Sequence, residues 1–383
     1  MKIAFVTELF APSVGGQEVR FEELGAELVK RGVEVDLYTI RHDLDSPKSE
    51  VRGGMRVHRI ADCAGYKHPT LRRHPQGILA FTWALWQRRA ELDACDAVVF
   101  NIWPILPPLV LGRRLRGRAV VDVCETRSGR FWHWIYQRLA GLPNVRLLGV
   151  SPEIVRHMQR VHGTRPERAH VAVSGVDLAA APQPPFGTDV KDAKQLMFFG
   201  RLTEHKNPRL LAEAFQRSTL PSRGYRLVIA GGGPELDGLK RDFTDPSIRL
   251  TGRVSDEEKW QLLQRSALLV LPSRREGFPR VVAEAACVGT PTLTLDYPDN
   301  GTRFVVQDYQ VGRSVPATRE ALVEALEQFA NEPQAWAELG EGALQRARDE
   351  FGWEPVTTRL LAFLRPGRTP PAQAAGSVQP QQA

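Results

Sequence analysis

The chain has 383 residues, of which 42% are hydrophobic and 25% charged, a composition that is typical of globular proteins and excludes a disordered or fibrous chain. At about 150 residues per domain, this length predicts two or three domains. No apolar run approaches the roughly 18 residues that span a bilayer, and the first residues lack the apolar core of a secretory signal. The net charge of +7 permits a nucleic acid, an anionic membrane or a phosphorylated small molecule as partner.

The cysteines form neither a CxxC pair nor a group with histidine at metal-ligand spacing; they are Cys63, Cys95, Cys124 and Cys287. This pattern disfavours a disulfide framework and a structural zinc site. It predicts reduced thiols and a cytoplasmic location.

The first forty residues predict a strand, a helix and a second strand. An apolar run at 2–7 is followed by a turn containing Gly15 and Gly16. Apolar positions then recur at the i, i+3, i+4 and i+7 spacing of an amphipathic helix, namely Phe21, Leu24, Gly25 and Leu28. Gly32 stands where this helix is expected to end, and alternating apolar residues at 33–37 predict the next strand. This β-α-β order is typical of a parallel, doubly wound sheet.

Further strands and helices follow in the same alternating order. In the first half we expect strands at 97–101, 119–123 and 147–151. Residues 179–194 carry three prolines and no periodicity, which predicts an exposed linker. After it we expect strands at 196–200, 226–230, 248–252, 267–271 and 290–295, helices at 208–217 and 279–287, a capping box at Ser255 and Glu258, and a helical stripe at 322–329.

The predicted fold is therefore α/β, with two Rossmann-like halves of similar size. The first domain is expected over residues 1–180 and the second over 190–350. A last helix at about 354–365 is expected to pack back onto the first domain. Residues 366–383 have almost no large apolar side chains, so this tail is predicted to be disordered.

Gly15 and Gly16 stand after the first predicted strand, where a helix begins. Glycines at such a place let backbone N–H groups approach an anion, and the helix N-terminus adds partial positive charge. The alternative is a tight turn that needs glycine only for its conformation. The pattern is not GxGxxG, so the dinucleotide fingerprint is missing.

A second candidate binding segment begins where the first strand of the second half ends. Arg201 follows Gly200 there, and Lys206 lies five residues further on. Ligands of open α/β sheets bind at the carboxyl ends of strands, and arginine can contact a phosphate through two hydrogen bonds. Two solvated cations are the alternative.

The third segment places two carboxylates eight residues apart, Glu276 in a loop and Glu284 on the following helix. That helix is otherwise apolar, so burial of Glu284 would require a partner. Sugar hydroxyls are such partners because carboxylates accept their hydrogen bonds. The backbone N–H groups of Gly277 and Phe278 are free to face a diphosphate. The alternative for Glu284 is a surface position.

These motifs resemble those of the retaining glycosyltransferases with the GT-B fold, specifically the family four group. The resemblance covers about residues 1–365 and rests on GGQE at 15–18, VS at 150–151, SGVD at 174–177, GRLTEHK at 200–206 and the two glutamates at 276 and 284. Each piece is short, but their order and spacing together are specific. The family fold consists of two Rossmann-like domains that face a cleft.

The resemblance implies a role for each matching residue. Arg201 and Lys206 match the pair that neutralises the donor diphosphate, and Gly15 and Gly16 match a loop of the first half that closes over the phosphates. The resemblance further implies that Glu276 is the catalytic carboxylate beside the sugar and that Glu284 binds the ribose. It implies contacts of Gly277, Phe278 and Pro279 with the sugar and phosphate. Arg253 and Val254 are expected at the base.

For activity, the resemblance implies transfer of a hexosyl unit from a nucleoside-diphosphate sugar, with UDP or GDP as the nucleotide. The acceptor is expected to be a hydroxyl of a glycan or lipid-linked saccharide, as in polysaccharide or cell-envelope synthesis. Retention of configuration is expected, without metal or cofactor. Fixed cations can stabilise the charge of the leaving group where other transferases use a divalent ion.

One departure from the family concerns the first half. Many relatives carry a histidine after its fourth strand, but here residues 121–127 contain none. Glu125, Arg127 or His133 are the candidates for that role, and the sequence does not choose among them.

Two aromatic and basic stretches, at 66–89 and 131–139, permit more than one interpretation. Each is compatible with peripheral contact with an anionic membrane at its cytoplasmic face, with a helix that packs its aromatic rings into the core, or with a lining for a sugar acceptor. Core packing is slightly favoured.

Other functions weighed on the same architecture are an epimerase, a phosphorylase and a non-catalytic protein that binds a sugar nucleotide. An epimerase would need acid and base groups around C2, and a phosphorylase a longer chain with a lysine for pyridoxal phosphate. A nucleic-acid-binding module ranks low because the basic residues are scattered among many acidic ones.

Overall fold

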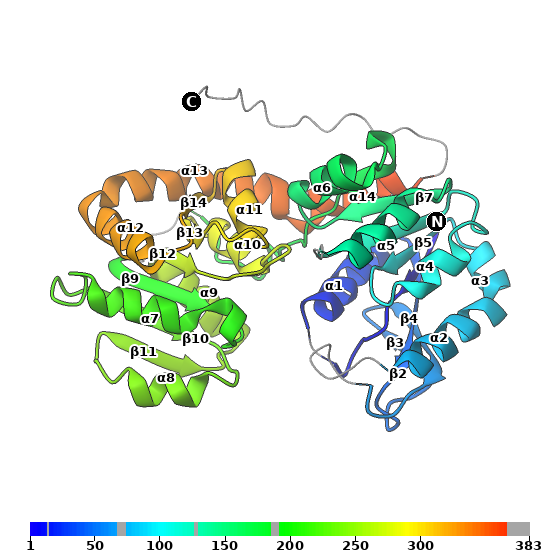
Figure 1. The fold of residues 1–383 in the computed structure, drawn as a ribbon, viewed down its shortest axis with the longest axis horizontal. Helices are drawn as coiled ribbons and strands as arrows, with labels where there is room; N and C mark the ends of the chain where they lie inside the picture. The colour runs from blue at the N-terminus through cyan, green and yellow to red at the C-terminus, as the bar shows by residue number, and fades with distance from the viewer. Residues whose placement is uncertain (14, 67–73, 126–128, 185–190, 366–383) are drawn as a thin grey trace. The chain divides into compact units, whose positions relative to one another are not determined.

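The structure is a computed structural model that describes residues 1–13, 15–66, 74–125, 129–184 and 191–365 (Figure 1). The predicted tail at 366–383 and Arg127 lie outside the described residues. The described chain forms two compact units. Unit 1 holds Met1–Gly175 together with the C-terminal helix, and unit 2 holds Val176–Gly352.

Unit 1 is built on a largely parallel sheet. Among its described residues the strands are β1 (Lys2–Val6), β2 (Glu34–Arg41), β3 (Ser49–Arg52), β4 (Met55–Asp62), β5 (Ala97–Asn101), β6 (Ala119–Val123), β7 (Val145–Gly149) and β8 (Ala169–Val171). Their order is β3-β4-β2-β1-β5-β6-β7-β8, and only the hairpin of β3 and β4 is antiparallel within this set. The direction of chain progression therefore reverses between β1 and β5.

The helices of unit 1 connect these strands. They are α1 (Gly16–Lys30), α2 (Pro75–Gln87), α3 (Arg89–Asp93), α4 (Leu106–Leu111), α5 (Arg130–Ala140), α6 (Pro152–His162), the 3₁₀ helix η1 (Pro166–Arg168) and α14 (Trp353–Leu364). The stripe predicted for the first helix is confirmed, because Phe21, Leu24, Gly25 and Leu28 are all buried in α1.

Unit 2 is also built on a parallel sheet with helices between its strands. Its described strands are β9 (Asp192–Phe199), β10 (Arg226–Ala230), β11 (Ile248–Gly252), β12 (Ser266–Leu271), β13 (Thr292–Leu295) and β14 (Gly312–Val315), in the order β11-β10-β9-β12-β13-β14. The helices are η2 (Glu204–Lys206), α7 (Pro208–Arg217), α8 (Leu236–Asp242), α9 (Asp256–Arg265), α10 (Arg280–Ala286), α11 (Thr302–Asp308), α12 (Arg319–Asn331) and α13 (Pro333–Phe351). Here the reversal lies between β9 and β12.

Several predicted elements have the observed bounds, namely β5, β6, β10, β11 and α7. The capping box is also confirmed: Ser255 Oγ accepts from the Glu258 N–H, and Glu258 Oε2 accepts from the Ser255 N–H. The strand expected at 33–37 is confirmed as β2, in which 35–40 are all buried. A strand inside a parallel sheet is covered on both faces, so its apolar residues need not alternate.

The segment after Gly175 differs from the expected linker. The Val176 N–H donates to the Phe351 carbonyl at 2.7 Å, and Arg348 donates to Gln183 and to the Pro182 carbonyl at 3.0 and 2.8 Å. These bonds attach residues 176–183 to the end of α13, so they belong to unit 2 and not to the first domain. Residues 185–190 of the expected linker lie outside the described chain, and β9 begins at Asp192.

Helix α14 packs on unit 1. A methyl group at Gly175 would lie 2.3 Å from the Trp353 ring, so only glycine permits this close approach. Arg146 of β7 donates to the Phe363 and Leu364 carbonyls at the end of α14. His170 of β8 stacks on the Phe363 ring at a centroid distance of 5.0 Å.

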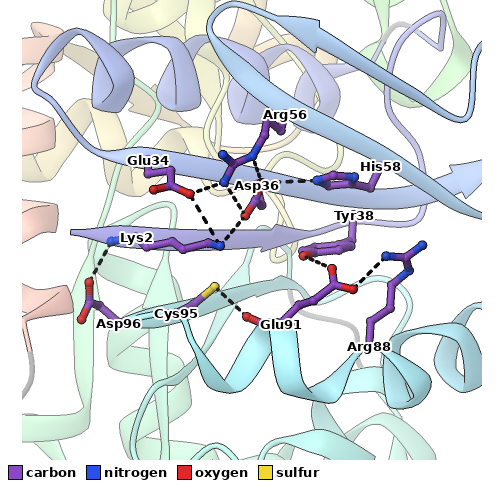
Figure 2. A network of polar contacts seen from close by, with 10 residues as sticks. All are labelled: Lys2, Glu34, Asp36, Tyr38, Arg56, His58, Arg88, Glu91, Cys95 and Asp96. Atoms are coloured by element: carbon purple, nitrogen blue, oxygen red, sulfur yellow. Dashed lines mark hydrogen bonds and ion pairs between the residues drawn. The ribbon is translucent and has the colours of Figure 1, made fainter.

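A polar network closes the amino ends of the unit 1 strands (Figure 2). Asp36 lies at its centre and is contacted by Lys2 at 3.1 Å, Arg56 at 2.6 Å and His58 at 3.3 Å. Burial would raise the pKa of Asp36, but hydrogen bonds from His58, Arg56 and Lys2 outweigh it and hold the pKa well below its usual range. The network is internally paired and lies at the end of the sheet opposite to where ligands of such folds bind.

Candidate functional site

The candidate site in unit 2 begins at the reversal between β9 and β12. The loop after β9 and the loop after β12 are joined by two hydrogen bonds: the Arg274 N–H donates to the His205 carbonyl at 2.7 Å, and Asn207 Nδ2 donates to the Pro272 carbonyl at 2.9 Å. Crevices at such reversals are where open α/β sheets bind ligands. The structure therefore brings the segments of Arg201–Lys206 and Glu276 to one place.

Positive charge gathers around His205 in this loop pair. His205 is exposed, but its partial desolvation is the first cause that lowers its pKa, and the charge of Lys206 is the second. Arg275 and Arg201 lower it further, whereas Glu276 opposes them. Arg201 and Arg275 are exposed. Their guanidinium groups are therefore accessible to an anion, with Lys206 in the same electrostatic neighbourhood.

Glu276 is held from two sides. Lys206 Nζ donates to Glu276 Oε1, and the two side chains are largely buried. The Glu276 N–H donates to the Asp299 carbonyl at 3.2 Å, and its carbonyl accepts from the Gly301 N–H at 2.8 Å. A methyl group at Gly301 would lie 2.3 Å from the Gly277 carbonyl oxygen, so the backbone approach requires glycine. These backbone hydrogen bonds fix the position of Glu276 and thereby the place from which its carboxylate projects.

The ring of Phe278 is turned into unit 2. It meets the buried Phe351 ring edge-on at a centroid distance of 5.7 Å. The side chain is therefore used for packing, and the polar groups that Gly277, Phe278 and Pro279 can offer to a ligand are those of the backbone.

Glu284 is buried, so the surface alternative is wrong. Its side chain projects from α10 and is only 7% exposed. The partner required by this burial is a protein residue: Lys259 Nζ on α9 donates to Glu284 Oε1 at 3.0 Å. The sequence analysis had not identified this lysine.

The loops after β9, β10 and β11 approach each other through glycines. A methyl group at Gly231 would lie 1.8 Å from the Gly200 carbonyl oxygen, and one at Gly233 2.3 Å from that of Leu202. One at Gly232 would lie 2.9 Å from the Arg253 side chain. Arg253 and Val254 therefore adjoin the same loop group as Arg201.

In unit 1, Gly15 caps helix α1 and Gly16 begins it. A methyl group at Gly15 would lie 2.4 Å from Glu18 Oε2, whereas Gly16 has no heavy atom of the described chain within 4 Å of such a group. Glu18 is buried and accepts from Ser13 Oγ at 3.2 Å. A carboxylate thus lies against the predicted anion loop.

The other unit 1 candidates lie beyond β6. Glu125 is half-buried, two residues after the strand. His133 lies on α5, and its ring packs against His162 of α6 at a centroid distance of 4.9 Å. Nearby, the buried ion pair of Arg20 and Asp122, at 2.6 Å, fixes α1 to β6.

The described residues contain neither a metal-binding cluster nor a helix that could span a membrane. In that part of the chain, His, Cys, Asp and Glu side chains form no cluster able to hold a metal ion. Among the same residues no helix combines the length and apolar character needed to cross a bilayer.

Comparison with known proteins connects this geometry to a family. The model described as Glycosyl transferases group 1 matches residues 184–346, and that of Glycosyltransferase Family 4 matches residues 14–180. A glycogen synthase of Mycobacterium tuberculosis is 30% identical over 283 residues, which cover 69% of this chain and 67% of the relative. The chain belongs to the glycosyl transferases group 1 family.

Two further matches extend over nearly the whole of this group 1 glycosyltransferase. A D-inositol 3-phosphate glycosyltransferase of Frankia alni is 26% identical and covers 94% of this chain and 96% of the relative. The structure of HepE from Anabaena in complex with UDP superposes with a TM-score of 0.69 at 18% identity, covering 94% and 98% of the two chains. The fold predicted from the sequence, two parallel-sheet α/β domains of GT-B type, is confirmed.

In this group 1 glycosyltransferase, three residues that position the predicted ones were not predicted from the sequence. Lys259 holds Glu284, and Asp299 and Gly301 hold the Glu276 backbone. The Asp299-Asn300-Gly301 run was readable as a turn signal. Lys259 carried no local signal, because its partner is 25 residues away.

Proposed function

We propose that the chain is a retaining, metal-independent hexosyltransferase that moves a sugar from a nucleoside diphosphate to a hydroxyl of a glycan or lipid-linked saccharide. The observation that carries the proposal is the gathering of Arg201, Lys206, Arg275 and Glu276 around His205 at the β9/β12 reversal. A diphosphate needs such cations, and a sugar ring offers hydroxyls to the adjacent carboxylate.

In the proposed reaction the bond between the anomeric carbon and the diphosphate oxygen breaks, and a bond from the acceptor oxygen to that carbon forms. The acceptor proton passes to a diphosphate oxygen, and the free nucleoside diphosphate leaves. Arg201 and Lys206 stabilise the charge that develops on the leaving group. Attack on the face from which the diphosphate departs retains the configuration, and Glu276 orients the sugar.

For the donor, we assign the ribose to Glu284, the base to Arg253 and Val254, and the sugar and phosphate backbone contacts to Gly277, Phe278 and Pro279. The HepE relative was determined with UDP, and UDP and GDP are the nucleotides that we propose here. Gly15 and Gly16 are assigned to the diphosphate.

For the acceptor, we propose recognition by unit 1, with Glu125 or His133 assisting near the reacting carbon. No cofactor is required. We propose a cytoplasmic location, supported by the four cysteines, all of which are free thiols.

Contact with an anionic membrane is supported by a surface of unit 1 that we call the aromatic–basic surface. It spans the neighbouring helices α2, α4 and α5 and exposes large apolar side chains, namely Leu79, Trp83, Val110, Phe131 and Trp134. Exposed arginines on or beside these helices are Arg88, Arg89, Arg113, Arg114, Arg130 and Arg138. Phe81 and Leu85 of α2 pack in the core, so the core interpretation holds for only one face of this helix. Apolar rings rimmed by arginine fit an anionic bilayer surface.

A donor screen tests the enzymatic proposal. UDP-, GDP- and ADP-sugars are added to the protein, and the melting temperature is recorded; a true donor raises it by mass action. Release of nucleoside diphosphate with a saccharide acceptor, unchanged by EDTA, and an NMR assignment of the anomeric product test turnover, metal independence and retention. Binding without turnover over a range of acceptors would favour the non-catalytic alternative, and failure of every donor to bind would contradict the proposal.

Vesicle flotation tests the membrane contact. Phosphatidylcholine vesicles with and without phosphatidylglycerol are compared, and only the anionic ones are expected to carry the protein. Trp83→Ser with Trp134→Ser should reduce the bound fraction. The matched control is Val51→Ser, because Val51 is 73% exposed but lies on β3. Equal loss in the control, or no loss in the tryptophan variant, would contradict this surface.

A further inference from the structure

Two buried, oppositely charged side chains meet between α9 and α10. Lys259 and Glu284 are 11% and 7% exposed in their side chains, and Lys259 Nζ lies 3.0 Å from Glu284 Oε1. The same Nζ also donates to Asp256 Oδ1 at 3.1 Å, but the Asp256 side chain is 93% exposed. The buried contact of Lys259 is therefore the one with Glu284.

Neither charge would be stable here alone. An unpaired buried ion loses its hydration, and removing one partner of such a pair leaves the other uncompensated. Burial lowers the pKa of Lys259, but the charge and hydrogen bond of Glu284, and after them those of Asp256, raise it above its ordinary value. Lys259 is thus a cation at neutral pH, and Glu284 has a fixed counter-charge.

The pair also joins two parts of the proposed nucleoside site. Lys259 lies on the first turn of α9, whose start directly follows Arg253 and Val254, the residues assigned to the base. The capping box of Ser255 and Glu258 fixes this start. Through Lys259 the Glu284 carboxylate is therefore held at a set position relative to the base-contacting segment.

The geometry leaves half of the carboxylate available. A carboxylate can accept about four hydrogen bonds through its two oxygens. Lys259 uses Oε1, and no hydrogen bond from a described residue is recorded to Oε2. An oriented carboxylate with one oxygen engaged can present the other to the two adjacent hydroxyls of a ribose.

We propose that Lys259 is a positioning residue that orients Glu284 toward the ribose of the donor and ties it to the segment that contacts the base. The inference rests on the proposed function, since it assumes a nucleoside diphosphate in unit 2. Its consequence is that discrimination between a ribonucleotide and its 2′-deoxy counterpart depends on Lys259, which itself touches neither.

The test measures this discrimination by calorimetry. The probes are UDP or GDP, whichever binds the full chain more tightly, its 2′-deoxy form, and inorganic pyrophosphate. In the unmodified protein the ribonucleotide is expected to bind about tenfold more tightly than the deoxy form, as for a lost hydrogen bond to a charged group. Lys259→Met is expected to reduce this ratio to about twofold or less, with pyrophosphate affinity unchanged.

Three further variants test the interpretation. Lys259→Gln keeps a donor group and is used if Lys259→Met does not fold; it is expected to lower the ratio as well. Asp256→Asn is the matched control, because it removes the exposed partner of the same Nζ, and it should keep the ratio. Glu284→Gln should lower the ratio without affecting pyrophosphate.

The outcomes separate the two proposals. A ratio that survives in Lys259→Met while the unmodified protein discriminates overturns the positioning role. Equal weakening of ribonucleotide, deoxynucleotide and pyrophosphate also overturns it, because a merely structural lysine would act in that way. If the unmodified protein binds none of the nucleotides, the proposed function itself fails.

Discussion

At the carboxyl ends of its strands, unit 2 gathers Arg201, Lys206 and Arg275, whereas unit 1 places the buried carboxylates of Glu8 and Glu18 there. Glu8 follows β1 and accepts from the Tyr66 hydroxyl at 2.8 Å. Both sheets reverse at equivalent places, so architecture alone does not assign their ligands. The charges of the two places differ: cations favour a diphosphate, whereas carboxylates accept hydrogen bonds from hydroxyls.

The units also bury different titratable groups. Unit 1 buries two histidines, His162 and His170, besides the ion pair of Arg20 and Asp122, whereas the candidate site of unit 2 contains two lysine–glutamate pairs. Ion pairs can be broken by a charged ligand, but buried imidazoles respond to pH. This contrast leads to different perturbations for each unit.

The largest effect is expected from Glu276→Gln. We expect kcat to fall by about 10² to 10³, or about 3–4 kcal/mol, since the sugar loses a charged acceptor in the transition state. Donor affinity should be unchanged or tighter, because Lys206 loses its carboxylate partner and is released to the diphosphate. Steady-state turnover and calorimetry measure the two quantities.

The control for this variant is Glu204→Gln, an exposed acid in the same loop whose side chain is 83% exposed. It should retain turnover. Turnover of Glu276→Gln at the level of the unmodified enzyme would remove Glu276 from the site and leave unit 2 with a cation cluster alone.

Acid should destabilise unit 1 through its histidines. Burial lowers the pKa of His162 and of His170 to about 4, with nearby positive groups adding to the effect. Between the unfolded pKa of about 6.5 and pH 4 the unfolded chain binds more protons, so the free energy of unfolding decreases as pH falls. Each histidine should contribute a loss of about 3 kcal/mol by pH 4.

Chemical denaturation at a series of pH values measures this slope. Fluorescent labels attached to α14 and β8 report the unfolding of unit 1. His170→Phe keeps the stack on Phe363 and removes the titration, so it should flatten the slope between pH 6.5 and 4. An unchanged slope would show that His170 is not a source of the acid sensitivity.

A smaller effect is expected from the cations. Arg201→Ala and Lys206→Ala should each weaken nucleoside diphosphate binding about ten- to a hundredfold, because each removes a charge-assisted hydrogen bond. Added salt should reduce the difference for the exposed Arg201. The control is Arg226→Ala, at the amino end of β10, where Arg226 pairs with Asp192. Calorimetry that finds both affinities unchanged would contradict the phosphate assignment.

The sequence predicted most of the unit 2 fold because its signals are local. The helix at 208–217 is bounded by proline and carries a periodic apolar stripe, and Ser255 with Glu258 forms a cap three residues apart. The positions of Arg201 and Glu276 followed from strand ends, since loops at the carboxyl ends of neighbouring parallel strands must meet.

What the sequence could not supply are contacts between distant segments. Lys259 lies 25 residues from Glu284, and whether a carboxylate pairs with a lysine or with a ligand depends on how two helices pack. In unit 1 the position of Glu18 over Gly15 depends on a side-chain rotamer and not on spacing. Tertiary packing determines these side-chain contacts, and the periodicity of the sequence does not reveal them.

The smallest effect is expected at the acidic end of unit 1. If the diphosphate contacts Gly15 and Gly16, the Glu18 carboxylate opposes it, so Glu18→Gln should tighten nucleoside diphosphate binding about two- to fivefold. Gly16→Ala should weaken binding by a similar factor, because its methyl group blocks close backbone approach yet meets no described atom within 4 Å. Gly342→Ala, on α13, is the control and should bind normally.

These two variants act in opposite directions on one ligand, so a general loss of stability does not imitate them. Melting temperatures should stay near that of the unmodified protein for Gly16→Ala, as alanine is favoured over glycine within a helix. If calorimetry finds neither tighter nor weaker binding, Gly15 and Gly16 serve the turn before α1, and the diphosphate is held by unit 2 alone. In that case the acidic end of unit 1 is left to the acceptor alone. The cations of unit 2 would then bind the diphosphate, and the carboxylates of unit 1 the acceptor.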